Sequence, residues 1–294
     1  MIQIYNYDDW KVYDGLASGS GRSEKIWLES SDGEIGVFKF PKVDERGNVA
    51  STEYVSEHIA SRMGNILNIP VANVAIGYRG GRIGCMSYRI GSFIEEGVNY
   101  ITKKYPSFNS NTLYAEDEDM FYCIEMVANS VAGTLDEGWF VPMLLFDFLI
   151  GNSDRHQSNW AILITDDGEY RLCPLYDNGS SLCSYIQEND IEKFMGRDEL
   201  RFDALVKSKS RSCIRVDGRS KRQPRHEEVL RFLLANYPLA RHKAEAYTRK
   251  LNRETVRFIV DEYPVEVLSA KKRVLIERFL NAKRDYMLEI LKEA

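Results

Sequence analysis

One short stretch limits what this chain of 294 residues can fold into. In LIGNSDRHQSNWAIL, Asn159 follows five positions after Asp154, and a second acid, Asp177, lies further on in LYDNGSS. Between them, NWAILI and YRLCPLY flank TDDGE, and β-rich runs around an Asp-Gly turn are typical of a hairpin. Because a hairpin returns the chain to its starting point, the sequence predicts that Asp154, Asn159 and Asp177 share one small volume.

These three side chains are suited to phosphoryl transfer. Asp154 would accept or orient the proton of an attacking hydroxyl, while Asn159 and Asp177 would hold Mg²⁺ against the phosphates of ATP. Mg²⁺ takes few carboxylate ligands and keeps waters, so an Asn/Asp pair is chemically sufficient. The competing interpretation is that DRH is a cap or loop ion pair and DNGSS an ordinary turn. The combination across a hairpin favours the metal and phosphate site.

A loop rich in glycine and serine near the amino terminus is the candidate phosphate clamp. In GLASGSGRSEK, Ser18, Gly19, Ser20 and Gly21 lie between two predicted strands. Glycines let the backbone approach phosphate oxygens, and inward N–H groups form an anion-binding nest. The loop lacks the Gly-Lys-Ser/Thr ending of a Walker loop, which disfavours a P-loop NTPase. By itself, such a loop is more often only a flexible turn.

Lys39, in the strand pattern EIGVFKF, is the candidate that neutralises the ATP phosphates. A glutamate on the following helix would orient it. Glu53, in the first turn of that helix, is the expected partner, and Glu57, one turn later, is the alternative. The competing interpretation makes Lys39 a solvated edge lysine and assigns the acids to the preference for negative charge near a helix start.

The pattern of elements changes near residue 95. Short strands punctuated by glycine fill the first part, broken by one helix that starts at Ser51 or Thr52 and that Gly64, Asn65 and Pro70 are expected to end. Helical patterns dominate the second part apart from the hairpin. One of them is marked by Met120, Ile124, Val127 and Val131. The sequence predicts an α+β fold of two lobes, a small strand-rich lobe over 1–95 and a larger helical lobe over 96–294.

Composition narrows the class of protein. The amino-acid composition is near average, with 28% charged residues, which excludes collagen-like, coiled-coil and largely disordered chains. The net charge of −5 argues against direct binding to nucleic acid. The five cysteines form no CxxC pair, which is typical of reduced thiols. The longest apolar run, FVPMLLFDFLI, is too short to span a bilayer, and the amino terminus lacks a secretory signal. A cytoplasmic protein without a membrane partner is expected.

A basic segment, VKSKSRSCIRVDGRSKRQPRH, places eight lysines and arginines against the single acid Asp217. It could bind an acidic protein, a tRNA attached to a substrate, or a phosphorylated loop of the chain itself. The commonest explanation of such a charge run is a solvated, mobile loop.

Five stretches together, SGSGRSEK, GVFKF, TEYVSEHIA, FDFLIGNSDRHQSN and LYDNGSS, resemble the HipA-like family of bacterial serine/threonine kinases over essentially the whole chain. The resemblance implies a protein-kinase-like fold with ATP between the lobes. It also implies that Asp154 is the catalytic aspartate, that Asn159 and Asp177 bind magnesium, and that Lys39 binds ATP. Ser18 is similar to the serine that family members autophosphorylate, and a phosphate there would oppose ATP binding through its negative charge.

The flanking residues Arg155 and His156 are expected to support the loop, His156 through a hydrogen bond. Zinc is improbable, since the four histidines show no paired spacing.

The resemblance also bears on partners. Full-length HipA toxins have an additional amino-terminal subdomain that contacts a DNA-binding antitoxin, and this sequence has no room for it before the phosphate loop, so it is similar to the short HipA-like kinases. A protein substrate is implied, with translation factors and aminoacyl-tRNA synthetases as candidates, and a separate antitoxin-like partner stays open, as does secretion as an effector. Two alternatives remain: a nucleotide-binding regulatory module that only autophosphorylates, and a small-molecule or lipid kinase of similar fold.

Overall fold

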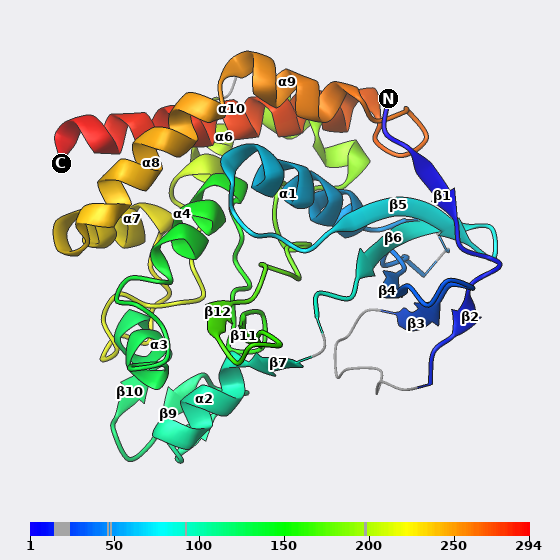
Figure 1. Cartoon of the computed structure of the whole chain (residues 1–294). Helices are drawn as coiled ribbons and strands as arrows, with labels where there is room; N and C mark the ends of the chain where they lie inside the picture. Colours follow the sequence, from blue (N-terminus) through cyan, green and yellow to red (C-terminus); the bar gives the residue numbers. More distant parts are fainter. Residues whose placement is uncertain (15–23, 46, 48, 92, 197–198) are drawn as a thin grey trace.

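The computed structural model describes residues 1–14, 24–45, 47, 49–91, 93–196 and 199–294 (Figure 1). Its strands are β1 (Ile4–Asn6), β2 (Lys11–Val12), β3 (Lys25–Glu29), β4 (Ile35–Lys39), β5 (Val74–Arg79), β6 (Arg82–Tyr88), β7 (Phe93–Glu96), β8 (Phe108–Asn109), β9 (Tyr114–Ala115), β10 (Met120–Phe121), β11 (Ala161–Ile164) and β12 (Tyr170–Leu172). Its helices are α1 (Glu53–Leu67), α2 (Gly97–Lys104), α3 (Ile124–Ser130), α4 (Val141–Ile150), the 3₁₀-helix η1 (Glu188–Asp190), α5 (Glu192–Met195), α6 (Glu199–Val206), α7 (His226–Asn236), α8 (Pro238–Lys250), α9 (Arg253–Asp261) and α10 (Ala270–Glu293).

The first six strands form one sheet in the order β1-β5-β6-β4-β3-β2. Only the β1–β5 pairing is parallel; the other strands pair antiparallel. The β3–β4 and β4–β6 pairings place Lys39 opposite Lys25 on one side and Cys85 on the other. Phe38, one residue earlier, points to the opposite face and is fully buried, as the alternation of a strand requires. Lys39 therefore lies at the end of a paired inner strand of the sheet.

Helix α1 packs on β5 and β6, and it also contacts α8 and α9 (Figure 1). The expectation that Gly64 helps to end this helix is wrong. The helix continues to Leu67, and Asn68 ends it in the left-handed conformation (φ 58°), with its N–H donating to the Gly64 carbonyl. A Cβ at Gly64 would lie 2.4 Å from a methyl carbon of Val71, so glycine is needed there for close packing of the chain that follows.

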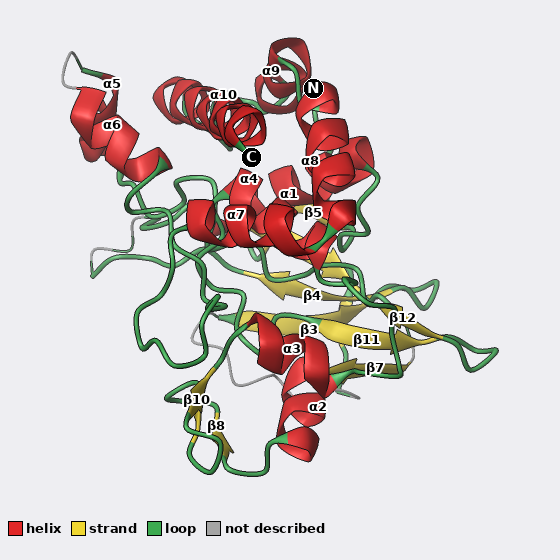
Figure 2. Ribbon diagram, turned by 90° about the vertical axis from the view of Figure 1, so that its left-hand side faces the viewer, coloured by secondary structure: helices red, strands yellow, loops and turns green. Residues whose placement is uncertain are grey.

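The helices of the second half enclose the main hydrophobic core. Figure 2 shows α4, α7, α8, α9 and α10 grouped on one side of the strands. The long helix α10 contacts α4, α6, α8 and α9. The helix predicted around Met120 is only partly present, because Met120 lies in β10 and α3 begins at Ile124. The intervening backbone bonds to a distant segment instead: Phe121 N–H donates to the Gly218 carbonyl (2.7 Å).

The hairpin predicted between Asn159 and Asp177 is present. Strands β11 and β12 pair antiparallel, Ile162 opposite Leu172, and β7 pairs with the other edge of β11 to complete a three-stranded sheet. Gly168, with φ 82°, lies in the turn. The fold is thus mixed α+β, as predicted, with strands concentrated in the first part of the chain and helices in the second. Among the described residues no helix is long and apolar enough to cross a membrane.

Candidate active site

The loop that carries Asp154 follows directly from the end of α4. Gly151, with φ 67°, ends that helix, and the Asn152 side chain then bonds in both directions. Its amide donates to Asp147 Oδ1 (3.0 Å), and its oxygen accepts from the Asp154 N–H (3.1 Å). The Asn159 amide donates to the Asp154 carbonyl (2.7 Å), which closes the loop. Helix and loop are therefore tied together on both sides of Asp154.

Arg155 connects this loop to the far end of the hairpin. Its guanidinium makes a bidentate pair with Asp147, with distances of 3.0 Å from Nε and 2.7 Å from Nη2. It also donates to the carbonyls of Asn159 (2.7 Å) and Tyr176 (2.9 Å) and to the side-chain oxygen of Asn178 (2.7 Å). Arg155 is only 1% exposed, so these contacts satisfy a buried charge. They hold the two residues that flank Asp177 against the loop that carries Asn159.

His156 contributes a smaller contact within the same loop. The Ser158 N–H donates to His156 Nδ1 (3.2 Å), and the His156 N–H donates to the Asp154 carbonyl (2.9 Å).

Lys39 lies between two acids. Its Nζ is 2.6 Å from Glu57 Oε1 and 2.9 Å from Asp177 Oδ1, so a strand, a helix and the end of the hairpin meet at one ammonium group. The expected partner Glu53 is wrong as a contact of Lys39. Its carboxylate bonds to Lys42 (2.9 Å) and to the Tyr185 hydroxyl (2.6 Å). The two glutamates are one helical turn apart along α1. Glu57, in the second turn, is the one that lies beside Lys39 at the end of β4.

The charges at this junction shift one another's protonation. Lys39 lowers the pKa of Asp177 to about 2, so this carboxylate is ionised at neutral pH. Burial alone would lower the pKa of Lys39, but Glu57 and Asp177 raise it above its ordinary value. Desolvation raises the pKa of Asp154, and the nearby Asp177 carboxylate adds to the effect. The two acids of the site are thus driven in opposite directions, which is typical of groups with different roles.

The segment after Asp177 holds α1 in place. The Asn178 N–H donates to Glu57 Oε2 (2.9 Å), and the Ser56 hydroxyl donates to the Ser181 carbonyl (3.1 Å). Asp177 itself has φ 55°, in the left-handed region that non-glycine residues seldom adopt. Strained backbone of this kind persists where the surrounding contacts determine it, and it concentrates at functional sites.

The other sequence candidates have different outcomes. Ser18, Gly19, Ser20 and Gly21 lie outside the described residues. The basic segment is packed along its middle, because Cys213 and Ile214 are buried and the Arg215 guanidinium donates to the Lys221 carbonyl (3.0 Å). The solvated-loop interpretation is therefore wrong for this part of the segment. Sequence reasoning missed this packing, although the apolar pair Cys-Ile inside the basic run was a signal for it.

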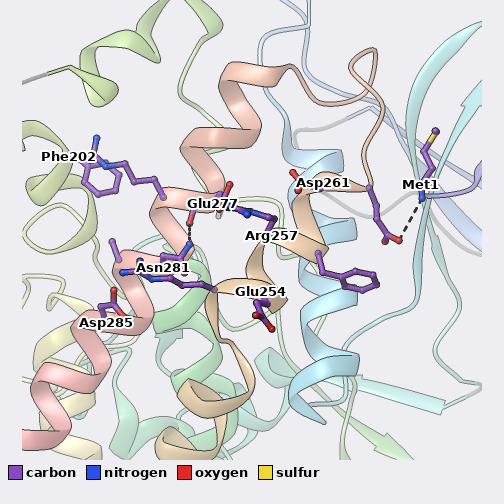
Figure 3. Close-up of a pocket in the computed structure, with 13 residues that line it drawn as sticks. Met1, Phe202, Glu254, Arg257, Asp261, Glu277, Asn281 and Asp285 are labelled. Atoms are coloured by element: carbon purple, nitrogen blue, oxygen red, sulfur yellow. Dashed lines mark hydrogen bonds and ion pairs between the residues drawn. The ribbon is translucent and has the colours of Figure 1, made fainter.

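A large open cavity of about 1060 Å³ lies elsewhere, between α9 and α10 (Figure 3). Phe202 of α6 and Met1 also line it, and Arg257 pairs with Glu277 across it (3.6 Å). None of the candidate residues that the structure describes lines this cavity, so Lys39, Asp154, Asn159 and Asp177 belong to a different site.

Comparison with known proteins connects this geometry to a family. The family model for the HipA-like C-terminal domain matches residues 17–231, which is most of the chain. The chain belongs to this family. A curated relative, the serine/threonine-protein kinase CtkA of Helicobacter pylori, is 24% identical over 296 residues, covering 90% of this chain and 87% of CtkA.

Two solved structures show the same fold. The crystal structure of the H. pylori proinflammatory kinase CtkA superposes with a TM-score of 0.82 at 16% identity, covering 99% of this chain and 98% of CtkA. HipA in the toxin–antitoxin complex with HipB and operator DNA from Shewanella oneidensis gives a TM-score of 0.59 at 16% identity, covering 96% of this chain and 68% of HipA. The predicted kinase-like fold is confirmed, and the enzyme class of this HipA-like chain is serine/threonine protein kinase.

Proposed function

We propose that this HipA-like kinase uses ATP and Mg²⁺ to transfer the γ-phosphate to a serine or threonine hydroxyl of another protein. The observation that carries the proposal is the contact of Lys39 with both Glu57 and Asp177, beside the loop of Asp154 and Asn159. An ion pair between a strand lysine and a helix glutamate, next to a metal-binding Asp, is the arrangement that active protein kinases require.

The residues present fit magnesium. Mg²⁺ is usually held by one or two carboxylates, with substrate phosphates and waters completing its octahedron. Asp177 supplies an ionised carboxylate that is half exposed, and Asn159 supplies an amide oxygen, because its nitrogen is engaged by the Asp154 carbonyl. The ion would neutralise charge on the transferred phosphate.

Asp154 is the proposed base. Desolvation raises its pKa above the ordinary value, which makes its carboxylate a better proton acceptor. In the reaction, the substrate hydroxyl oxygen forms a bond to the γ-phosphorus while the bond from that phosphorus to the β,γ-bridging oxygen breaks. ADP leaves with the bonding electron pair, and the hydroxyl proton moves to Asp154. Lys39 binds the ATP phosphates, and Glu57 orients Lys39.

Labelling with [γ-³²P]ATP tests the assignment. Purified protein is incubated with ATP, Mg²⁺ and a cell extract whose own kinases have been heat-inactivated. Asp154→Asn and Asp177→Asn should each abolish label incorporation, whereas Asp166→Asn, in the exposed turn of the same hairpin, should retain it. Undiminished labelling by Asp177→Asn would overturn the magnesium assignment. Label on the enzyme alone would favour the alternative of a regulatory module that only autophosphorylates.

Ser18 is the proposed autophosphorylation site within the phosphate loop of Ser18, Gly19, Ser20 and Gly21. A phosphate there carries about −1.5 to −2 charges, which would repel the ATP phosphates and switch the kinase off. Intact-mass analysis after incubation with ATP should show one added phosphate in the wild type and none in Ser18→Ala. A Ser18→Ala protein that still gains the phosphate would place the modified residue elsewhere.

The partners and lobe boundary are proposed on related grounds. We propose a protein substrate, for which translation factors and aminoacyl-tRNA synthetases are the first to test, and a separate antitoxin-like protein as regulator, supported by the fold shared with the HipA of the HipB complex. The division near residue 95 into two lobes is supported by the strand pairing. β6, which ends at Tyr88, is the last strand along the chain to join the first sheet, and the next strand, β7, pairs with β11 instead.

A further inference from the structure

A buried chain of hydrogen bonds runs from the last helix to the loop of Asp154. Lys283 Nζ, on α10, donates to the Ser210 hydroxyl oxygen (3.1 Å). The same hydroxyl lies 2.8 Å from His226 Nδ1, at the start of α7, and His226 Nε2 lies 3.0 Å from the Asn152 carbonyl oxygen. The exposed fractions of Lys283, Ser210, His226 and Asn152 are 0%, 7%, 2% and 1%.

The chemistry of the groups gives this chain one direction. A carbonyl oxygen only accepts, so His226 Nε2 must carry a proton and donate to Asn152. Burial, with Lys283 adding repulsion, keeps the pKa of His226 well below its ordinary value, so the ring is neutral and its Nδ1 is an acceptor. The Ser210 hydroxyl must then donate to Nδ1, and its oxygen accepts from Lys283. Every proton in the chain therefore points from α10 toward the catalytic loop.

The end of the chain is the residue that ties the loop together. Asn152, whose carbonyl accepts from His226, uses its side chain to bond both Asp147 and the Asp154 N–H. A change in the orientation of the Asn152 peptide would thus be felt at Asp154 two residues later. Hydrogen bonds through Ser210 and His226 link Lys283 of α10 to this peptide.

Lys283 is a costly residue at this position if packing is its sole role. In the part of the chain that the structure describes, its Nζ contacts the Val206 carbonyl (3.3 Å), the Ser210 hydroxyl and the Phe148 ring (4.0 Å to the centroid), and none of these is an acid. Burial lowers the pKa of this amine to about 7. A methionine would fill a similar volume without that desolvation cost. The polar contacts, and what they support, are the reason to have a lysine here.

We propose that Lys283, Ser210 and His226 are positioning residues that hold the catalytic loop through the Asn152 carbonyl. The inference rests on the proposed function, since the loop it positions carries the proposed base. Because the three residues touch neither ATP nor the acceptor, losing one should lower kcat and leave the KM for ATP nearly unchanged.

A double-mutant cycle on kcat tests whether the three residues act together. Lys283→Met and His226→Leu should each lower kcat about tenfold with the ATP KM within about twofold, and the double variant should be no slower than the slower single variant. His226→Gln retains an N–H near Nε2 and should recover most of the activity. Lys272→Met is the matched control. This buried lysine of α10 donates to the carbonyls of Cys183 (2.5 Å) and Ile186 (2.7 Å) and takes no part in the hydrogen bonds from Lys283 to Asn152. The fold-changes in kcat of Lys272→Met and His226→Leu should therefore multiply in the double variant.

Hydrogen exchange provides a readout that does not depend on activity. Lys283→Met should speed amide exchange in the 151–157 peptide about tenfold or more, whereas Lys272→Met should do so in the 182–187 peptide. Unchanged exchange at 151–157, multiplicative effects of Lys283→Met and His226→Leu, or a raised KM with normal kcat would each overturn the inference. If Lys283→Met fails to fold, Ser210→Ala takes its place in both experiments. An inactive wild type would instead refute the proposed function. The exchange data would still show whether the hydrogen bonds from Lys283 to Asn152 hold the loop in place.

Discussion

The two ion-pair clusters beside Asp154 differ in their access to solvent. In the Lys39–Glu57–Asp177 cluster the exposed side-chain fractions are 21%, 4% and 51%, whereas in the Arg155–Asp147 pair they are 1% and 2%. A sealed pair cannot exchange partners without leaving a charge unpaired in the core. An open cluster can, because water or a ligand ion compensates whichever charge is released.

This difference separates the part of the site that must stay fixed from the part that must rearrange. Arg155 holds the loop and the hairpin end in one geometry, and the partners that it contacts there are all protein groups. The Asp177 side chain is half exposed, so in the proposed function it could release Lys39 and hold Mg²⁺. We infer that the closed pair sets the position of the site and the open cluster performs its ligand-dependent changes.

The largest effect is expected from breaking the sealed pair. Arg155→Met should destabilise the fold by about 3–5 kcal/mol, because it leaves Asp147 buried without its counter-ion. Urea unfolding monitored by circular dichroism measures this. Adding Asp147→Leu should recover much of the loss, and Arg171→Met, which removes an exposed pair with Glu169 in the hairpin, should leave the unfolding midpoint unchanged. If Arg155→Met unfolds at the wild-type midpoint, the sealed pair is not a structural anchor.

Breaking the open cluster should affect catalysis more than stability. Glu57→Gln keeps the shape of the side chain but removes the charge that orients Lys39, and we expect kcat/KM for ATP to fall by about 10- to 100-fold. The unfolding free energy should change by less than in Arg155→Met. Glu53→Gln, one turn earlier on α1, is the matched comparison and should cost under about threefold. Equal losses for the two variants would reject Glu57 as the functional partner.

The sequence predicted one of these clusters better than the other. The hairpin that brings Asp177 back toward Asn159 was predictable, because pairing of adjacent strands is a local rule, and it supplies one member of the open cluster. The choice between Glu53 and Glu57 went wrong, since a helical pattern specifies which face a residue occupies and not which turn is level with a neighbouring strand.

The sealed contacts were less accessible to sequence reasoning. Arg155 was expected to support the loop, but its pairing with Asp147 was not foreseen, because Asp147 lies inside an apolar helix pattern that gives no hint of its partner. The chain from Lys283 to Asn152 joins residues far apart in the sequence and has no local pattern at all. Met120 shows the same limit: its apolar spacing fitted a helix, and backbone bonds to the distant 215–218 segment decided otherwise.

Lys283 is a third kind of buried charge. It is as buried as the Arg155–Asp147 pair, but the partners that the structure describes for it are a hydroxyl, a carbonyl and an aromatic ring in place of an acid. Its folded-state pKa of about 7 lies below that of an unfolded lysine, so the unfolded chain binds the extra proton between these two values. Stability from this group should therefore rise with pH, by up to about 1.4 kcal/mol per unit. His226, the titratable side chain coupled to it, stays neutral throughout this range.

Urea unfolding at pH 7 and pH 9 tests this sign. The wild type should gain stability relative to Lys283→Met as the pH increases, and Lys272 is present in both proteins, so its own titration cancels. A difference that is constant with pH, or that shrinks, would show that Lys283 keeps an ordinary pKa in the folded protein.

The smallest effect should come from the most open contact of the site. The Tyr185 hydroxyl donates to Glu53 (2.6 Å) and lies 3.0 Å from the Ser180 hydroxyl, yet the residue is 52% exposed. Water can replace both bonds, so Tyr185→Phe should change the unfolding free energy by about 0.5 kcal/mol or less. Its kcat should stay within about twofold of wild type, because Glu57 still holds Lys39. If Tyr185→Phe lost as much activity as Glu57→Gln, the importance of these contacts would not follow their burial. The Lys42–Glu53–Tyr185 group would then take part in the reaction.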